Sequence, residues 1–450
     1  MSIAAILLAA GQGTRMQSDL PKVLHKIAGA PMIVHAMSSA DALGPERVIV
    51  VTGHGGEAVE AAVADWREDV AFAQQTEQLG TAHAVKAAAE ALDGFAGDAV
   101  VLYGDTPFIR GETLEAMRGA RRDGAAVVVL GFEAAEPGGY GRLVTGPEGL
   151  EAIVEAKEAT PDQLAITLCN SGVVMADAAL LMDLVGAVGN DNAKGEYYLT
   201  DIVGLARDRG LACAAVTCEE AETLGVNSRP DLAVAERVFQ DRRRAEAMEG
   251  GVTLTAPETV HFAFDTHIGR DVEIAPNVVF GPGVTVETGA VIRAFCHLEG
   301  CHVSNGAEIG PYARLRPGAE IGEKARVGNF VEVKNADVHE GAKINHLTYV
   351  GDAEIGKRAN IGAGTITCNY DGVFKHRTVI GEGAFIGSNS ALVAPVTIAD
   401  GGYVASGSVV TENVGPGDLA IGRARQVNKQ GLGARMVARL KALKASKGQG

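Results

Sequence analysis

The sequence is poor in aromatic residues and in paired cysteines, and no signal peptide is visible. Aromatic residues make up only 5% of the 450 positions, so Ala, Val, Ile and Leu must build the core. The six cysteines are scattered without a CxxC pair, which favours reduced thiols over disulfides or zinc sites. The apolar run Ile3–Ala10 is far shorter than the roughly 20 residues of a membrane helix. We therefore expect a cytoplasmic protein without membrane insertion.

Positive charge is also scarce. The chain has 40 Lys and Arg against 56 Asp and Glu, a net charge of −16, which argues against nucleic acid or an anionic membrane as the main partner. The end of the chain is the exception, because it has eight basic residues and no acidic one from Arg423 onward. We expect residues 424–450 to form either a solvated basic tail or a contact with an anionic ligand or an acidic neighbouring subunit.

The first half of the chain alternates short apolar runs with helical segments. This alternation predicts βαβ units and a mostly parallel sheet covered on both faces. The predicted strands are Ile3–Ala10, Val48–Thr52, Ala99–Tyr103, Ala126–Gly131 and Val173–Ala176, and the predicted helices include Thr81–Leu92 and Thr113–Arg122. We assign residues 1–228 to this domain and residues 229–249 to a linking helix that begins with Arg229-Pro230.

Apolar residues then recur at every sixth position, a spacing that neither a helix nor an ordinary strand explains. The series comprises Ile268, Ile274, Phe280, Val286, Ile292 and Leu298; Ile309, Leu315, Ile321, Val327 and Val333; Ile355 and Ile361; and Ile380, Ile386, Leu392, Ile398, Val404 and Val410. Six-residue periodicity is typical of a β-helix, in which stacked coils bury one continuous aliphatic column. We assign residues 250–423 to it.

Two long slips interrupt the six-residue series. Val333 and Ile355 lie 22 residues apart, and Thr367 and Ile380 lie 13 apart, so neither interval is a multiple of six. Both intervals carry polar residues. We therefore expect loops to leave the β-helix at these two places.

The first predicted strand runs into Gly11-Gln12-Gly13-Thr14-Arg15-Met16, followed by Pro21-Lys22. A lone GxG is weak evidence, and this segment lacks the lysine of a Walker A loop and the third glycine of a dinucleotide fingerprint. The longer string from Leu8 to Lys22 resembles the signature of sugar-nucleotide pyrophosphorylases. That resemblance implies that Arg15 and Lys22 hold a nucleoside triphosphate and offset charge in the transition state.

The resemblance covers nearly all of residues 3–229 and implies a nucleotide-sugar site. The metal ligands would be Asp105 and Asn227, whose hard oxygens suit Mg²⁺. The residues implied to bind UTP or the nucleotide sugar are Leu8, Ala9, Ala10, Gly11, Gly13, Lys22, Gln78, Gly80, Thr81, Tyr103, Gly104, Asp105, Gly141, Glu155, Asn170 and Asn227. Taken alone, Asp105 is equally a strand-end cap and Asn227 equally a turn residue.

Polar strings near the two slips extend the resemblance to the whole chain. They are Arg314–Gly318, Glu332–Lys334, Asn345–Asp352, Asn360–Thr365 and Cys368–Gly372. With the N-terminal motifs they resemble the bacterial bifunctional glucosamine-1-phosphate acetyltransferase and N-acetylglucosamine-1-phosphate uridylyltransferase family. The fold this implies is a Rossmann-like α/β nucleotidyltransferase domain followed by a left-handed parallel β-helix of hexapeptide repeats.

Membership of that family would assign roles to the polar strings. His346 would be the general base of acetyl transfer, since a histidine titrates near neutral pH. The sugar phosphate would be bound by Arg316, Lys334, Tyr349 and Asn360, and acetyl-CoA by Ala363, Asn369, Tyr370, Lys375, Ser388, Ser406 and Arg423. Ser406 departs from the alanine common at its position.

The resemblance also implies the substrates and the assembly. The substrates would be glucosamine 1-phosphate, N-acetylglucosamine 1-phosphate, UTP and acetyl-CoA, and the nucleotide sugar produced would supply peptidoglycan and lipopolysaccharide synthesis. One β-helix offers only an outer groove, so a homotrimer with sites between subunits is implied. Two alternatives stay open: a nucleotidylyltransferase with one activity and a structural β-helix, and an inactive sugar-nucleotide sensor.

Overall fold

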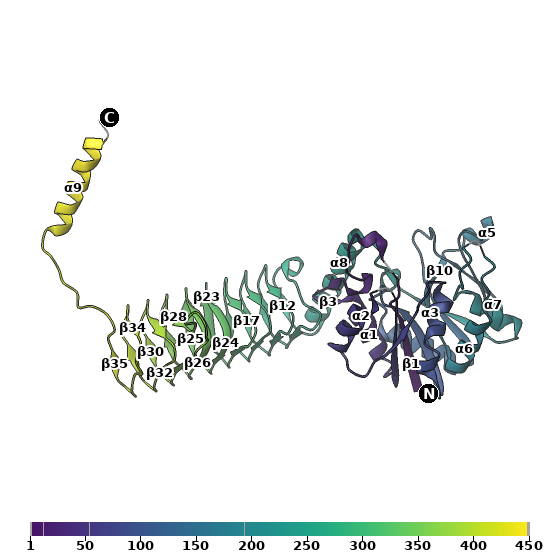
Figure 1. The fold of residues 1–450 in the computed structure, drawn as a ribbon, viewed down its shortest axis with the longest axis horizontal. Coiled ribbons are helices and arrows are strands. Elements are labelled where there is room, and N and C mark those ends of the chain that lie inside the picture. Colours follow the sequence, from purple (N-terminus) through teal and green to yellow (C-terminus); the bar gives the residue numbers. More distant parts are fainter. Residues whose placement is uncertain (1, 12, 54, 193, 448–450) are drawn as a thin grey trace. The chain divides into compact units, whose positions relative to one another are not determined.

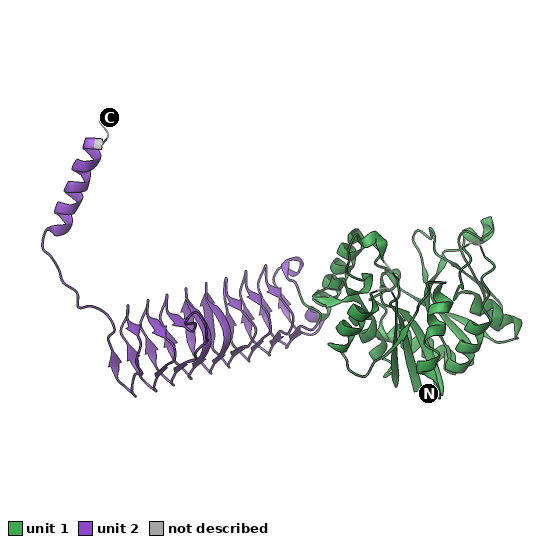
Figure 2. Ribbon diagram, in the orientation of Figure 1, with its two compact units in different colours: residues 1–246, 262–264 green, residues 247–261, 265–450 purple. Residues whose placement is uncertain are grey.

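A computed structural model describes residues 2–11, 13–53, 55–192 and 194–447. The chain divides into two compact units, residues 1–246 with 262–264 and residues 247–261 with 265–450 (Figure 2). The segment 262–264 therefore packs with the first unit although it follows the linking helix in sequence. Within the described ranges, no helix is both long enough and apolar enough to cross a membrane.

A mixed sheet forms the centre of the first unit, with its strands in the order β11-β7-β10-β6-β1-β4-β5. Strand β1 pairs in parallel with β4 and β6, and β10 runs antiparallel to β6 and β7. The strands are β1 Ser2–Leu8, β4 Arg47–Thr52, β5 Ala71–Gln74, β6 Gly97–Tyr103, β7 Val127–Glu133, β8 Arg142–Gly146, β9 Gly149–Val154, β10 Leu168–Asp177 and β11 Cys213–Cys218, with a small ribbon of β2 Lys26–Ile27 and β3 Ala30–Pro31. The predicted Rossmann-like class is confirmed.

Aliphatic side chains on both faces of this sheet are buried under helices, as the apolar strand runs predict. The helices are η1 Thr14–Met16, η2 Lys22–Leu24, α1 Met32–Asp41, α2 Gly56–Ala64, α3 Thr81–Ala87, η3 Glu90–Leu92, α4 Gly111–Arg122, α5 Pro161–Leu164, α6 Ala178–Ala187, α7 Asp201–Asp208, η4 Glu220–Thr223 and α8 Arg229–Glu249. The helix expected over Thr81–Leu92 ends at Ala87, because the N–H groups of Ala88 and Ala89 bond to carbonyls three residues back, which tightens the last turn.

The second unit is a stack of short parallel strands, visible as successive rungs in Figure 1. The strands are β12 Thr253–Leu254, β13 His267–Ile268, β14 Glu273–Ile274, β15 Val279–Phe280, β16 Thr285–Val286, β17 Val291–Ile292, β18 His297–Leu298, β19 Cys301–Val303, β20 Glu308–Ile309, β21 Arg314–Leu315, β22 Ala319–Ile321, β23 Arg326–Asn329, β24 Glu332–Val338, β25 Lys343–His346, β26 Tyr349–Ile355, β27 Asn360–Ile361, β28 Ile366–Cys368, β29 Thr378–Ile380, β30 Phe385–Ile386, β31 Ala391–Val393, β32 Val396–Ile398, β33 Tyr403–Val404, β34 Val409–Val410 and β35 Leu419–Ala420, with η5 Pro257–Thr259 before β13 and helix α9 Leu432–Lys447 after β35.

The predicted six-residue series forms the interior column of this unit. From Ile274 to Val410 every member of the series is buried, and only Ile268 in the first coils is partly exposed. The rungs are those of the left-handed hexapeptide β-helix, so this part of the predicted fold is confirmed. By contrast, residues 433–446 of α9 are exposed, and Leu432 at its start is partly exposed.

The first slip in the series is not a loop, which corrects the expectation for the interval from Val333 to Ile355. Three further aliphatic residues, Val338, Ile344 and Val350, are buried inside the interval. The spacings are therefore five, six, six and five residues, and β24 and β26 each run through a corner of the coil without leaving it. A corner shortened by one residue explains the slip. Only the second interval contains an excursion, which spans residues 369–376 between β28 and β29.

Truncating one residue of the interior column is expected to destabilise the β-helix. Ile344 is fully buried in β25, so Ile344→Ala should cost about 2–5 kcal/mol of unfolding free energy through lost burial and a cavity. Urea unfolding of the full chain, followed by circular dichroism, would measure the shift. Lys343→Ala is the matched control, because its exposed neighbour on the same strand should change stability by less than about 0.5 kcal/mol.

Candidate active sites

In the first unit, three segments bring two cations and two oxygen ligands together. Lys22 lies at the start of η2, and its ammonium forms an ion pair with Asp105, which follows β6. The same Lys22 Nζ donates to Asn227 Oδ1 at 3.1 Å. Arg15, from η1, donates to that oxygen at 2.9 Å. These residues meet at the carboxyl ends of β1 and β6, where strand order reverses and ligands bind in such sheets.

Two glycines of the N-terminal motifs are required by close packing. Gly13 has a left-handed φ of 62°, and a Cβ there would lie 2.5 Å from Lys22 Cβ. Gly80 has a φ of 117°, and its Cβ would lie 2.5 Å from the Tyr197 carbonyl oxygen. Any side chain at either position would therefore displace Lys22 or the segment around Tyr197.

The residues predicted to bind the nucleotide and the sugar line two adjoining cavities, of about 290 and 220 Å³. The two cavities share Thr81, Tyr103 and Glu196. The predicted residues that line the first are Leu8, Ala9, Ala10, Gly11, Lys22, Gln78, Gly80, Thr81, Tyr103 and Asp105, and those that line the second are Thr81, Tyr103, Glu155 and Asn170. Gly104 lies between two residues that line the first cavity, and its N–H donates to the Leu8 carbonyl at 3.0 Å.

The second cavity carries a carboxylate and an amide suited to sugar hydroxyls. Burial raises the pKa of Glu155, and the nearby Lys194 partly offsets this rise. Asn170 Oδ1 accepts a hydrogen bond from the Gly172 N–H at 3.0 Å, which fixes the amide. Gly141 lies beside both residues, since its carbonyl accepts from the Asn170 N–H at 2.8 Å and a Cβ on it would approach Glu155 Oε1 to 3.7 Å.

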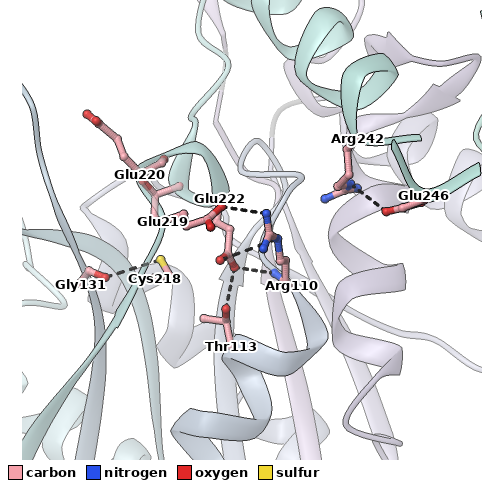
Figure 3. A network of polar contacts seen from close by, with 10 residues as sticks. Arg110, Thr113, Gly131, Cys218, Glu219, Glu220, Glu222, Arg242 and Glu246 are labelled. Atoms are coloured by element: carbon pink, nitrogen blue, oxygen red, sulfur yellow. Dashed lines mark hydrogen bonds and ion pairs between the residues drawn. The ribbon is translucent and has the colours of Figure 1, made fainter. Parts of the chain in front are cut away.

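A buried carboxylate anchors the segment that leads to Asn227. Glu222 accepts hydrogen bonds from the Arg110 N–H at 2.9 Å and from the Thr113 hydroxyl at 2.7 Å (Figure 3). Four residues further on, the Val226 N–H donates to the Asp105 carbonyl at 3.0 Å. The backbone at Asn227 is therefore tied directly to the residue that carries the other candidate metal ligand.

In the second unit, His346 has a partner that the sequence motifs did not reveal. His346 Nδ1 lies 2.7 Å from Oδ1 of Asn329, one coil earlier. An amide oxygen accepts the Nδ1–H, which leaves the lone pair on Nε2. His346 is exposed, so a substrate can reach that nitrogen. In the sequence, the signal for this pair is the spacing of 17 residues between Asn329 and His346, which is the length of a coil with one shortened corner.

Three cations gather on the next face of the β-helix. Lys375, in the excursion after β28, lies against Lys334 and lowers its pKa below the usual value, with smaller contributions from burial and from Arg316. Arg316 also donates to Glu332 at 2.7 Å. Like charges held close together are unfavourable, so the cluster is suited to a phosphate. Lys375, predicted as an acetyl-CoA residue, therefore lies with the residues predicted to bind the sugar phosphate.

A polar cluster continues this face toward the excursion. The amides of Asn335 and Asn369 both donate to Asp352, the first at 2.6 Å. Burial raises the pKa of Asp352, but these two hydrogen bonds and the ammonium groups of Lys375 and Lys334 outweigh it and keep that pKa low. Tyr349 folds over Gly351, where a Cβ would lie 2.4 Å from the Tyr349 hydroxyl. The aspartate thus orients Asn369 and adds negative charge beside the cations.

The remaining predicted residues lie along later coils. Asn360 is half-buried in β27, and Ala363 follows it at a corner. Ser388, Ser406 and Arg423 are exposed on successive coils, and Tyr370 is exposed in the excursion. Among the described residues of this one chain, no hydrogen bond or ion pair joins His346 to the three cations. The base and the cation cluster are thus separate groups on neighbouring faces.

Comparisons with known proteins agree with this two-part arrangement. Residues 5–168 match the MobA-like NTP transferase domain, and residues 265–300 and 377–412 match the bacterial transferase hexapeptide repeats. The chain is 62% identical over 450 residues to the bifunctional protein GlmU of Ruegeria sp. strain TM1040, covering 100% of both chains. It is 61% identical over 445 residues to that of Jannaschia sp. strain CCS1, covering 99% of this chain and 98% of the relative.

Another relative, the bifunctional protein GlmU of Paracoccus denitrificans, is 60% identical over 446 residues, or 99% of each chain. An NTP transferase domain implies nucleotide substrates, and the two domains fit uridylyl transfer and acetyl transfer. Full-length identity at this level extends the likeness to both units at once. The chain therefore belongs to the GlmU family of bifunctional enzymes.

Proposed function

We propose that the chain makes UDP-N-acetylglucosamine in two reactions. Residues 250–423 transfer the acetyl group of acetyl-CoA to glucosamine 1-phosphate. Residues 1–228 then join the product, N-acetylglucosamine 1-phosphate, to the uridylyl group of UTP and release pyrophosphate. The observation that carries the proposal is that each unit brings cations together: Arg15 and Lys22 both donate to Asn227 Oδ1 in the first unit, and Lys334 lies against Lys375 in the second. The reactions would take place in the cytoplasm, where the six free cysteines stay reduced.

In uridylyl transfer, a phosphate oxygen of the sugar phosphate attacks the α-phosphorus of UTP, and the bond from that phosphorus to the pyrophosphate oxygen breaks. Both reactants are anionic, so their approach requires neutralisation. Arg15 and Lys22 would supply it at the triphosphate. The larger cavity would hold the nucleotide, with Gln78 and Gly80 near the base. Glu155, Asn170 and Gly141 would bind the sugar in the smaller one.

Asp105 and Asn227 fit a magnesium ion. Their side-chain oxygens both contact the Lys22 ammonium, so hard donors already converge on one cationic position. Among the described residues, no group of three His, Cys, Asp or Glu could hold a metal, which suits an ion completed by water and phosphate oxygens. Once bound, Mg²⁺ would neutralise phosphate charge. Lys22 would then turn from Asp105 toward the triphosphate.

In acetyl transfer, the amine of glucosamine 1-phosphate attacks the thioester carbonyl carbon, and the carbon–sulfur bond breaks to release coenzyme A. Nε2 of His346 accepts the proton that the amine loses. Asn329 holds the tautomer that leaves this nitrogen free. Arg316, Lys334 and Lys375 would bind the phosphate, with Tyr349 and Asn360 at the sugar. Acetyl-CoA would lie along the coils past Ala363, Asn369, Tyr370, Ser388, Ser406 and Arg423.

The active assembly is proposed to be a homotrimer. Three aromatic rings, those of Phe295, Tyr312 and Phe330, stack along one corner with centroids 4.9 and 5.2 Å apart, and Leu347 continues the column. All four residues have positive φ and about half or more of their surface exposed. Strained backbone that presents bulky apolar side chains to solvent supports burial against another subunit. Leu347 adjoins His346, so that subunit would border the base.

Placing a charge on this corner is expected to dissociate the assembly. Phe295→Asp buries a carboxylate in an apolar contact, so light scattering after size exclusion should give the mass of one chain instead of three. Acetyl transfer should fall with it while uridylyl transfer continues. Leu164→Asp, an exposed apolar position on α5, is the matched control. An unchanged mass for Phe295→Asp would contradict the proposed interface.

The proposed function itself is tested by two assays on the same preparation. Thiol release from acetyl-CoA is measured with glucosamine 1-phosphate and, for comparison, with glucosamine 6-phosphate. Pyrophosphate release from UTP is measured with N-acetylglucosamine 1-phosphate and Mg²⁺. Both products should appear, and the 6-phosphate should be a poor acceptor. Pyrophosphate release without thiol release would instead favour an enzyme with one activity and a structural β-helix.

A further inference from the structure

The loop before β8 is held by a single buried arginine. Arg142 is only 2% exposed, and its guanidinium donates to the carbonyls of Pro137 at 3.3 Å and Gly138 at 3.2 Å and also to that of Tyr140. Three carbonyls of one loop thus bond to a single side chain. No other residue type could do this as well, because only guanidinium has five donors in a rigid plane.

Burying the Arg142 guanidinium in this way costs free energy of folding. Among the residues that the structure describes, no carboxylate forms an ion pair with Arg142, and its buried Nε has no partner. Burying a cation against carbonyls and the Cys169 thiol is unfavourable compared with burying one that is paired with a carboxylate. Arg121 shows the usual solution in the same unit, since its guanidinium pairs with the buried Asp98 at 2.7 Å. A structural role alone does not account for an unpaired charge at Arg142.

The loop ends at the sugar cavity. Its sequence, Pro137-Gly138-Gly139-Tyr140-Gly141, contains three glycines and would be flexible on its own. Gly141 bonds through its carbonyl to the Asn170 N–H at 2.8 Å and lies against Glu155. Tyr140 packs edge-on against Phe132, with ring centroids 5.1 Å apart. Arg142 and the Tyr140 ring therefore help to fix the loop beside the cavity.

We propose that Arg142 is a positioning residue for the sugar phosphate. Its buried guanidinium keeps the glycine-rich loop ordered, so that Gly141, Asn170 and Glu155 form a preorganised sugar site. This inference rests on the proposed uridylyl transfer. It assigns Arg142 no contact with UTP. Loss of the guanidinium should therefore weaken the sugar phosphate and leave the nucleotide unaffected, because a flexible loop must be ordered on each binding event.

The test compares Arg142→Lys with Arg121→Lys in the full-length protein. Lysine keeps the charge but cannot bridge three carbonyls. For Arg142→Lys we expect the KM for N-acetylglucosamine 1-phosphate to rise about tenfold or more, with the KM for UTP within about twofold of the wild type. Arg121→Lys should lower thermal stability without separating the two KM values. Acetyl transfer by the second unit is measured in each variant as a control that the chain is intact.

A second measurement does not depend on activity. Hydrogen–deuterium exchange of the peptide covering residues 136–142 should be faster in Arg142→Lys and normal in Arg121→Lys. If the lysine variant does not fold, Arg142→Gln is used instead. It removes the buried charge together with the desolvation cost of that charge. This variant should show the same faster local exchange and the same difference between the two KM values. Unchanged exchange, or an equal change in both KM values, would overturn the inference. A wild type that releases no pyrophosphate would instead refute the proposed function, while the exchange result would still decide the role of Arg142 in ordering the loop.

Discussion

Replacing His346 with alanine is expected to lower the rate of acetyl transfer by about 10²–10⁴-fold, the usual contribution of a general base. The amine of the substrate must lose its proton as it attacks the thioester, and Nε2 of His346 is the nitrogen left free by the bond to Asn329. The measurement is thiol release from acetyl-CoA with saturating glucosamine 1-phosphate. Pyrophosphate release from UTP by the same sample should be unchanged.

Asn329→Ala provides the matched control for this prediction. The alanine variant leaves the imidazole present but removes the acceptor that holds its tautomer, so acetyl transfer should fall by less than in His346→Ala. In the double variant the two effects should not add, because Asn329 acts only through His346. A His346→Ala enzyme that keeps more than about a tenth of its acetyl transfer would show that another group takes the proton.

The second large effect is expected at Asp105. Asp105→Ala removes the carboxylate that faces Lys22 and, by the proposed function, one of two protein ligands of Mg²⁺. Uridylyl transfer should fall by at least about 10³-fold, because both the metal and the position of Lys22 are lost while negative charge builds up. The assay is pyrophosphate release over a range of Mg²⁺ concentrations. Acetyl transfer should be retained.

Asp105→Asn separates the two parts of this effect. The asparagine keeps an oxygen ligand but loses the charge, so activity should be partly restored at high Mg²⁺ if the carboxylate binds the metal. If Asp105 only orients Lys22, then Mg²⁺ should have no such effect. A variant Asp105→Ala with normal uridylyl transfer would contradict both roles.

Much of the fold follows from local pattern. The six-residue series predicts the β-helix because each member must point inward, and all but the first are buried. The apolar runs predict the strands of the first unit for the same reason. The pattern failed at the interval from Val333 to Ile355, where the coil shortens a corner and continues. A spacing count cannot distinguish a shortened corner from an excursion, since both break the period.

The sites are less accessible to sequence reasoning. The motif around Lys22 and the string around His346 can be read from the sequence, whereas Asn329 and Glu196 receive no role from it. Asn329 meets His346 only because one coil takes 17 residues. Glu196 lines both cavities because the next residue holds its segment against α3, where the Tyr197 carbonyl accepts from the Ala82 N–H at 3.0 Å. The sequence predicts that Lys375 binds acetyl-CoA, and the structure adds that it lies against Lys334.

The sequence by itself determined the two architectures, the order of the units and the residue types available for phosphate and proton transfer, because periodicity and short motifs are local properties of a chain. Only the tertiary structure decided which of those residues meet: Lys22 with Asn227 across 205 positions, three cations on one face of the β-helix, and one unpaired guanidinium under a glycine-rich loop. Such meetings depend on how coils and strands stack, and stacking brings together side chains whose separation in sequence carries no signal.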